Sequence, residues 1–310
     1  MTRMHLDIME MIPLLIIFAT LLVGGVLTVC FHGFIFYRII QKTHGINAIL
    51  TVCVTYQCLF GLFGIFHSSY SLFNLLCEDA VQESVMFWSA LPLYALRMVL
   101  PISSVFLAAD RLMSMKCPMQ YKFSISKKLD VVAAIFTTVV LLVNFVVYLC
   151  NREPSTASPY IFGRYVKPGV IYALSDVYNG FCILNIILTV LFVKFFFSFV
   201  SAQRRTRTIS PEQYRNVHTT NVMVFYQLIV EFVFEVIPSL ATSIAQYGFN
   251  TNWPQQIGPY VLALQVVYTT ICSVTYTWKT RVCKCGDTIR TSEATNTTHQ
   301  YLSTVSGHVR

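Results

Sequence analysis

Ionisable side chains inside long apolar stretches are the residues of this sequence most able to do chemistry. Asp110 and Arg111 form an adjacent ionic pair at the end of an apolar run, Ser84 to Ala109, in which Arg97 is the only charged residue. A charged group at membrane depth is costly unless it faces a partner or water. A pair at the edge of such a run can exchange partners, which is the chemistry of a conformational switch rather than of bond breaking.

Further ionisable residues stand deeper in the apolar stretches. Arg97 precedes Arg111 by a rise of about 21 Å and an angular offset of about 40° if the segment is helical, so both point to one side. Glu231 and Glu235 have i, i+4 spacing and share a helix face. We expect these residues and Asp176 to face the interior, with Arg97 opposite Glu235 or Glu231 at the border of a ligand cavity. A purely structural ion pair is the alternative.

Composition indicates the environment in which these residues must be positioned. Hydrophobic residues make up 55% of the 310-residue chain and charged residues 12%, with a mean hydropathy of +0.61. Water-soluble domains carry about 25% charged residues, so we expect a chain embedded in lipid. The net charge of +8 resides in connecting segments rather than on one helix face, which argues against a nucleic-acid partner.

Seven stretches reach the roughly 20 apolar residues that a spanning helix needs. The predicted fold class is therefore all-α, an integral membrane bundle of seven transmembrane helices. The predicted spans are Met11 to Tyr37, Ile46 to Leu76, Val85 to Ala109, Val131 to Cys150, Val170 to Val193, Asn221 to Tyr247 and Ile257 to Trp278.

The distribution of positive charge predicts the orientation of the bundle. Of the 22 lysines and arginines, four fall in connections on the N-terminal side and seventeen on the opposite side, with Arg97 inside a span. Positive residues gather on the cytoplasmic side. We therefore expect an extracellular N-terminus (residues 1–10), a transmembrane domain (11–278) and a cytoplasmic tail (279–310) in the plasma membrane.

The cysteines divide according to this topology. Cys77 and Cys150 fall at the outer membrane edge, where an oxidising compartment favours a disulfide between them; two unpaired thiols are the alternative. Cys283 and Cys285 follow the last span in a basic strip that is suited to palmitoylation. The hydroxyl-rich tail beyond them could be phosphorylated and recruit a kinase or an arrestin-like partner; an inert tail is the alternative.

Enzymatic function is not indicated by any motif. The sequence lacks a His-Glu-x-x-His metal site and a convincing nucleophile–base set, so we expect no cofactor and no metal. The competing class is a transporter or ligand-gated channel subunit, in which the intramembrane charges would line a permeation path. An odd number of spans and the absence of paired broken helices argue against inverted repeats.

The residues after the third span resemble a known motif. The end of the third helix in rhodopsin-like G-protein-coupled receptors is similar to the pattern formed here by Asp110, Arg111, Ser114, Met115, Pro118 and Tyr121. Pro238 resembles that family's sixth-helix proline, and Tyr276 its seventh-helix tyrosine. The chain departs from the family at Leu112 and has no acidic residue in its second span for the family's sodium site.

Taken with the short N-terminus and aromatic spans, the sequence is similar to the nematode serpentine chemoreceptors, within them to class BC. The resemblance implies an olfactory receptor, in sensory cilia, that activates a heterotrimeric G protein. It also implies that Arg111 pairs with Asp110 at rest and turns toward the G protein on activation. Basic inner loops would contact the G protein or anionic lipid. The 14% aromatic content favours a small, partly apolar ligand.

Overall fold

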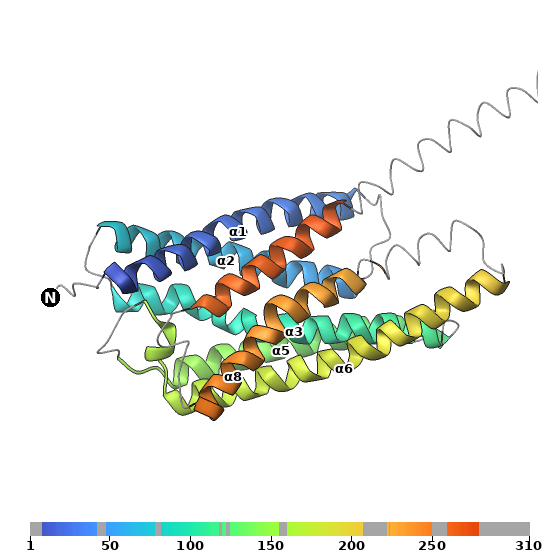
Figure 1. Cartoon of the computed structure of the whole chain (residues 1–310). Helices are drawn as coiled ribbons and strands as arrows, with labels where there is room; N and C mark the ends of the chain where they lie inside the picture. Colours follow the sequence, from blue (N-terminus) through green and yellow to red (C-terminus); the bar gives the residue numbers. More distant parts are fainter. Residues whose placement is uncertain are drawn as a thin grey trace, which may run out of the picture.

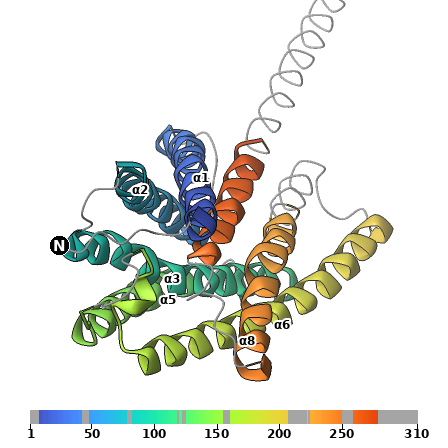
Figure 2. The same ribbon diagram turned by 60° about the vertical axis from the view of Figure 1, so that its left-hand side comes forward.

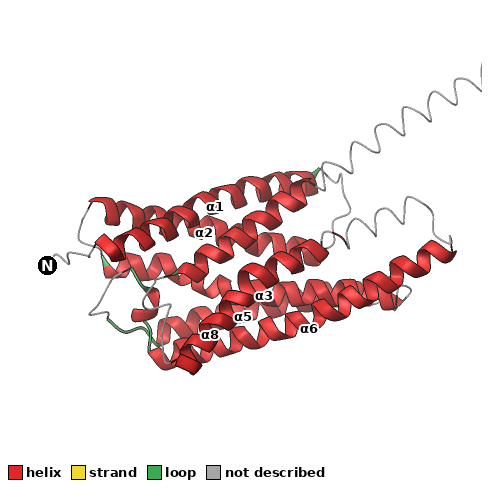
Figure 3. Cartoon of the chain, viewed as in Figure 1, coloured by secondary structure: helices red, strands yellow, loops and turns green. Residues whose placement is uncertain are grey.

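Seven helices that are long and apolar enough to cross a membrane dominate the chain wherever its structure is described. The computed structural model describes residues 8–41, 48–77, 82–117, 120–121, 125–154, 160–206, 222, 224–249 and 259–278. Figure 3 shows helices joined by short loops throughout these ranges, and no strand occurs within them. The prediction of an all-α bundle with seven spans is confirmed.

The first five spans are single helices, whereas the sixth contains a wider turn. The sixth span, Val224–Phe249, includes the π-helical segment η3 (Phe232–Val236) and ends as α8 (Ile237–Phe249). The seventh span is Tyr260–Trp278. The other helices are α1 (Ile8–Ile40), α2 (Ala48–Cys77), α3 (Glu83–Lys116), α5 (Ser126–Cys150) and α6 (Pro168–Thr206).

Two helices continue well past their predicted spans. Helix α6 ends at Thr206 rather than Val193, and the end of α3 is the difference that affects the ionic pair. We predicted that the span stops at Ala109, but the helix continues to Lys116 and so contains both Asp110 and Arg111. No proline or glycine interrupts the intervening sequence, and the helix ends shortly before Pro118, as expected because a proline disfavours helical geometry in the residue before it. The ionic pair is therefore held on a rigid helix rather than in a loop.

Helix α3 occupies the centre of the bundle. It packs against α2, α5 and α6. Figures 1 and 2 show α1, α2 and the seventh span on one side of α3, with α5, α6 and α8 on the other. We call the end where α1 and α3 begin the loop end, and the opposite end the Arg111 end. A change at one end of α3 can reach the other end without leaving the helix.

The outer surface of α5 shows why this bundle suits lipid. Five large apolar residues spaced three or four apart are each at least half exposed: Val131, Ile135, Val139, Leu142 and Val146. Such spacing places them along one helix face. A continuous apolar stripe of this length in contact with water would be a docking or aggregation site, whereas acyl chains solvate it readily.

Small residues bring α1 against its neighbours. A Cβ atom added to Gly25 would lie 2.9 Å from the backbone oxygen of Gly61 in α2. One added to Gly24 would lie 2.9 Å from the Cγ1 atom of Val266 in the seventh span. Glycine at both positions allows close helix approach, which is the usual way that membrane helices gain packing contacts.

We call the described residues of the connection between α5 and α6, 151–154 and 160–167, the lid; they lie at the loop end. Arg152 and Val166 form an isolated antiparallel bridge between the two arms of the lid. The short helix η2 (Phe162–Arg164) precedes Val166 in the second arm. Phe162 is only 3% exposed and stacks on Tyr94 of α3 at 4.3 Å between ring centroids. The lid thus inserts an aromatic side chain among the helices.

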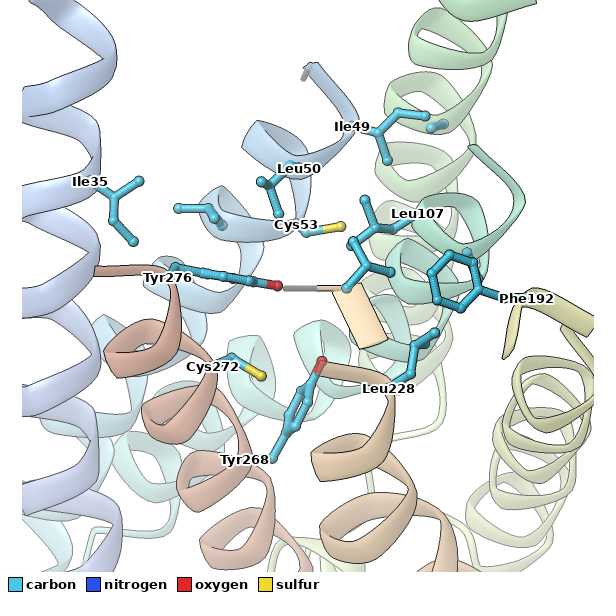
Figure 4. Close-up of a cluster of buried hydrophobic side chains, with 14 of the residues drawn as sticks. Ile35, Ile49, Leu50, Cys53, Leu107, Phe192, Leu228, Tyr268, Cys272 and Tyr276 are labelled. Atoms are coloured by element: carbon cyan, nitrogen blue, oxygen red, sulfur yellow. The ribbon is translucent and has the colours of Figure 1, made fainter. Parts of the chain in front are cut away.

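The largest apolar cluster lies toward the Arg111 end. Figure 4 shows Tyr268 and Tyr276 of the seventh span pointing into it beside Leu107 of α3 and Phe192 of α6. Both tyrosines are at most 2% exposed. Their hydroxyl groups are therefore enclosed by apolar side chains and must find partners inside the bundle.

Candidate functional site

A cavity lies beneath the lid at the loop end. Its volume is about 90 Å³, and its walls come from α3, α5, α6, the lid and the sixth and seventh spans. Residues that line it include Tyr94, Arg97, Tyr148, Tyr178, Ile161 and Leu262. Aromatic and aliphatic walls with a few polar groups are typical of sites for small molecules.

Arg97 is the one charged residue among the described residues that line this cavity. Its guanidinium carbon lies 4.6 Å from the centroid of the Tyr178 ring, which is a cation–π contact. Its buried Nε atom has no hydrogen-bond partner among the described residues. Arg97 therefore lies at the border of a cavity; its role in ligand binding stays a prediction.

The predicted ion pair between Arg97 and Glu235 or Glu231 is wrong. Within the described ranges, neither carboxylate comes within salt-bridge distance of Arg97. Tyr178 contacts both Arg97 and Glu235 instead, because its hydroxyl donates a 2.7 Å hydrogen bond to Oε1 of Glu235. The same oxygen accepts a 3.0 Å bond from Nε2 of Gln265. Glu235 contacts Tyr178 but is not among the residues that line the cavity.

Asp176 also differs from its prediction. Its side chain is exposed, and both carboxylate oxygens accept from the Tyr247 hydroxyl, at 2.9 and 3.0 Å. The reason is helical geometry, since Asp176 and Tyr178 are about 200° apart around the axis of α6. Because Tyr178 faces the interior, Asp176 must face outward.

A row of polar side chains continues from Glu235 toward the Arg111 end. Gln227, Glu231 and Glu235 follow one another at intervals of four residues in the sixth span, and each is at most 2% exposed. We call these three residues the polar row. Glu231 accepts hydrogen bonds from Asn185 of α6 and, at 3.5 Å, from Tyr268 of the seventh span.

Gln227 completes the row nearest the Arg111 end. Its Nε2 atom lies 3.2 Å from the Tyr268 hydroxyl and 3.3 Å from Oγ of Ser104 in α3. Its Oε1 atom accepts from the hydroxyl of Tyr276. The polar row therefore ties the sixth span to α3, α6 and the seventh span at successive levels of an otherwise apolar core.

The Asp110–Arg111 pair forms as predicted. Nη2 of Arg111 lies 2.6 Å from Oδ2 of Asp110, whose side chain is fully buried. The Tyr121 hydroxyl donates to Oδ1 of the same carboxylate. Burial, and then the hydrogen bond to Asp110, raise the pKa of the Tyr121 hydroxyl above its ordinary value of about 10. Tyr121 is therefore protonated at neutral pH and remains a donor to Asp110.

The predicted disulfide is wrong in this structure. Cys77 and Cys150 are free, exposed thiols at the ends of α2 and α5. Both helices pack against α3. Pro118, Cys283, Cys285 and the tail, with its predicted lipidation and partner sites, lie outside the described residues.

The uncharged members of the site were missed in the sequence. Gln227 and Gln265 are amides inside apolar spans, and the spacing of Gln227, Glu231 and Glu235 is visible without a structure. The expected site was based on charged residues, and these amides are uncharged. Tyr178 gave no comparable signal, since tyrosines are common in these spans. No group of three or more potential metal ligands occurs among the described residues.

Comparison with known proteins identifies no family for this chain. No family model matches the chain, and no curated protein is similar to it.

Proposed function

We propose that this protein is a seven-transmembrane receptor that binds a small molecule in the cavity beneath the lid and activates a heterotrimeric G protein at the Arg111 end. The observation that carries the proposal is that one central helix, α3, has Arg97 in the cavity and the Asp110–Arg111 pair near its other end. A receptor needs two separate sites joined by a structure that can adopt two states.

The polar row supplies a route by which the two sites affect each other. Ligand contact with Arg97 or Tyr178 disturbs the hydrogen bond from Tyr178 to Glu235. Movement of the sixth span then breaks the contacts of Glu231 and Gln227 with the seventh span and α3. Buried polar contacts of this kind exist in discrete arrangements rather than deforming continuously.

The Asp110–Arg111 pair is the switch at the far end of this route. At rest, Asp110 holds both Arg111 and Tyr121. When the sixth span moves away, Arg111 exchanges Asp110 for groups of the G protein, and Tyr276 is a candidate partner within the opened cleft. The motif formed by Asp110, Arg111 and Tyr121 supports this role because of its resemblance to the corresponding motif of G-protein-coupled receptors.

Within this class, the resemblance to nematode serpentine chemoreceptors favours an olfactory receptor. We place it in the plasma membrane of sensory cilia with an extracellular N-terminus and a cytoplasmic tail. The cavity volume of about 90 Å³ and its mostly apolar walls fit a small, partly apolar ligand.

The decisive experiment measures ligand-dependent nucleotide exchange on a purified G protein by the chain reconstituted in lipid nanodiscs. Exchange that depends on ligand and is lost in Arg111→Ala supports the proposal. Exchange that persists unchanged in Arg111→Ala, with the variant folded, contradicts the assigned switch.

A second candidate function is a transporter or a ligand-gated channel subunit. It is favoured by the two buried carboxylates Glu231 and Glu235, since intramembrane acids often mark proton or ion pathways. Ligand-dependent current or uptake in cells that lack G-protein signalling, abolished by Glu231→Gln, would favour this function over the receptor.

A further inference from the structure

The cavity beneath the lid has a positive charge and no counter-ion in its described lining. Its described lining contains Arg97 and no acidic residue. We propose that the cavity binds short-chain monocarboxylates and that Arg97 holds the carboxylate group. This inference rests on the ligand-binding role proposed above and specifies the chemical class of the ligand.

The state of Arg97 is the first step. Its side chain is buried among the helices, it forms no ion pair with a described residue, and its Nε atom has no hydrogen-bond partner there. The ring of Tyr178 offers a cation–π contact but no counter-ion. A buried charge is costly until it is paired and hydrogen-bonded, so the site is completed by an anion.

Glu235 does not supply that anion. Its Oε1 atom accepts from Tyr178 and Gln265, it forms no ion pair with Arg97, and it is not among the residues that line the cavity. A carboxylate entering the cavity instead reaches the guanidinium directly and can use the planar two-donor geometry that makes arginine the preferred partner of carboxylates. The unpartnered Nε atom is one donor available for this contact.

The dimensions of the cavity limit the rest of the ligand. Near Arg97, the walls are formed by Tyr94, Met98, Tyr148 and Leu262, which favour a hydrocarbon chain. The cavity volume of about 90 Å³ is below that of an engineered apolar cavity of about 150 Å³ that accepts benzene. We therefore expect an aliphatic acid with a short hydrocarbon chain rather than a bicyclic aromatic acid.

Arg97 also determines which analogues are rejected. A primary amine of the same length would bring a second cation into a poorly hydrated cavity, where like charges repel strongly. A primary amide would fit but leave the arginine without a counter-ion. Specificity is a difference of affinities, so comparison of the acid with its own amine and amide isolates the role of charge.

The test is direct binding to the full-length chain in nanodiscs without a G protein. Saturation binding of radiolabelled butyrate and isovalerate is measured, with competition by butyramide and n-butylamine. We expect saturable binding of the acids and no competition by the amine or the amide at concentrations at which the unlabelled acid competes fully. The proposal is overturned if the amine or the amide competes as well as the unlabelled acid. It is also overturned if neither acid binds saturably to the folded protein.

Four variants separate the charge from the fold. Arg97→Gln should weaken acid binding by about 10- to 100-fold, the effect of removing a charged hydrogen-bond partner, while Arg97→Lys should retain part of the affinity. Glu235→Gln should bind the acids as tightly as wild type or more tightly, because it removes a nearby negative charge. Asp176→Asn changes an exposed acid on the outward face of α6; it is the matched control and should not alter affinity.

The outcomes distinguish this inference from the function on which it rests. Wild-type affinity in a folded Arg97→Gln variant overturns the carboxylate site. Acid binding that depends on Arg97 but never stimulates nucleotide exchange would leave the site intact and remove the receptor function. Exchange that is stimulated by amines or neutral molecules and depends on Arg111 would support the receptor function and remove the carboxylate site.

Discussion

Asp110 is the residue on which the resting state of the proposed switch depends. A single buried carboxylate holds the Arg111 guanidinium through one oxygen and the Tyr121 hydroxyl through the other. The two contacts restrain different groups, a helix side chain and a tyrosine in the connection that follows α3. Their unequal strengths allow them to be tested separately, because a charged pair usually contributes more than a neutral hydrogen bond.

We expect Asp110→Asn to raise nucleotide exchange in the absence of ligand by about fivefold or more, the lower range of allosteric coupling energies. The asparagine keeps an acceptor for Tyr121 but loses the charge that holds Arg111. Tyr121→Phe should give a smaller increase, since it removes only the hydrogen bond. Exchange is measured on purified protein at matched receptor concentration. Basal exchange equal to wild type in both variants would show that the pair is merely structural.

At the scale of helices, packing between α1 and α2 depends on glycine at the point of contact. We expect Gly25→Val to destabilise the bundle by about 1–3 kcal/mol, as overpacking of a tight interface does, because its Cβ atom would meet the Gly61 carbonyl oxygen at 2.9 Å. The thermal midpoint of the purified protein in detergent is the measurement.

Gly33→Val is the control for this change. Gly33 lies in the same helix, but a Cβ atom added there has no neighbour within 4 Å. Its thermal midpoint should match or exceed that of wild type, because valine loses less backbone entropy than glycine when it is fixed in a helix. Equal losses of stability in both variants would mean that helix propensity, rather than the contact with α2, explains the effect.

The lid contributes Ile161 and Gly163 to the wall of the cavity, and we expect it to control access. Phe162 stacks on Tyr94 and packs edge-on against Tyr148, at 4.3 and 5.3 Å between ring centroids. We expect Phe162→Ala to speed ligand dissociation by about tenfold or more, since truncation of a buried phenylalanine costs about 3–5 kcal/mol, part of which would lower the free energy of lid opening. Radioligand washout is the measurement.

Phe162→Leu keeps most of the apolar volume and should dissociate ligand at a rate between those of wild type and Phe162→Ala. Unchanged washout in Phe162→Ala would indicate that the ligand enters elsewhere, for example between helices from the lipid.

At the scale of the whole molecule, the sequence predicted the number of spans and most of their bounds because each span is a long apolar run with charges at its ends. It also predicted the Asp110–Arg111 pair, since adjacent residues at a helix end remain close in any packing. Which faces of different helices meet could not be predicted. Asp176 and Tyr178 could each have faced inward, and only the packing of α6 decides that Tyr178 does.

The same limit explains the failed ion pair. Spacing placed Glu231 and Glu235 on one face but gave no distance to Arg97, and an uncharged ring from a third helix occupies the intervening space. The prediction assumed that each buried carboxylate pairs with a positive charge. In the structure, Glu231 and Glu235 accept hydrogen bonds largely from neutral donors. The amides Gln227 and Gln265 in the apolar spans were the feature of the sequence that indicated neutral hydrogen-bond partners.

The orientation of the molecule remains a prediction that one experiment checks. The excess of lysine and arginine in the connections at the Arg111 end predicts a cytoplasmic location for that end. An epitope at the N-terminus should be stained on intact cells, and one at the C-terminus only after permeabilisation. Staining of the C-terminal epitope alone on intact cells would invert the topology and remove the proposed G-protein site.

The free thiols of Cys77 and Cys150 have a practical consequence for the lid. Aromatic stacking and a few backbone hydrogen bonds between its two arms hold it in place, without a sulfur cross-link to α2. Dithiothreitol should therefore leave ligand affinity and thermal midpoint unchanged. The protein should be produced in functional form in a reducing cytosolic or cell-free system, without any oxidative refolding step.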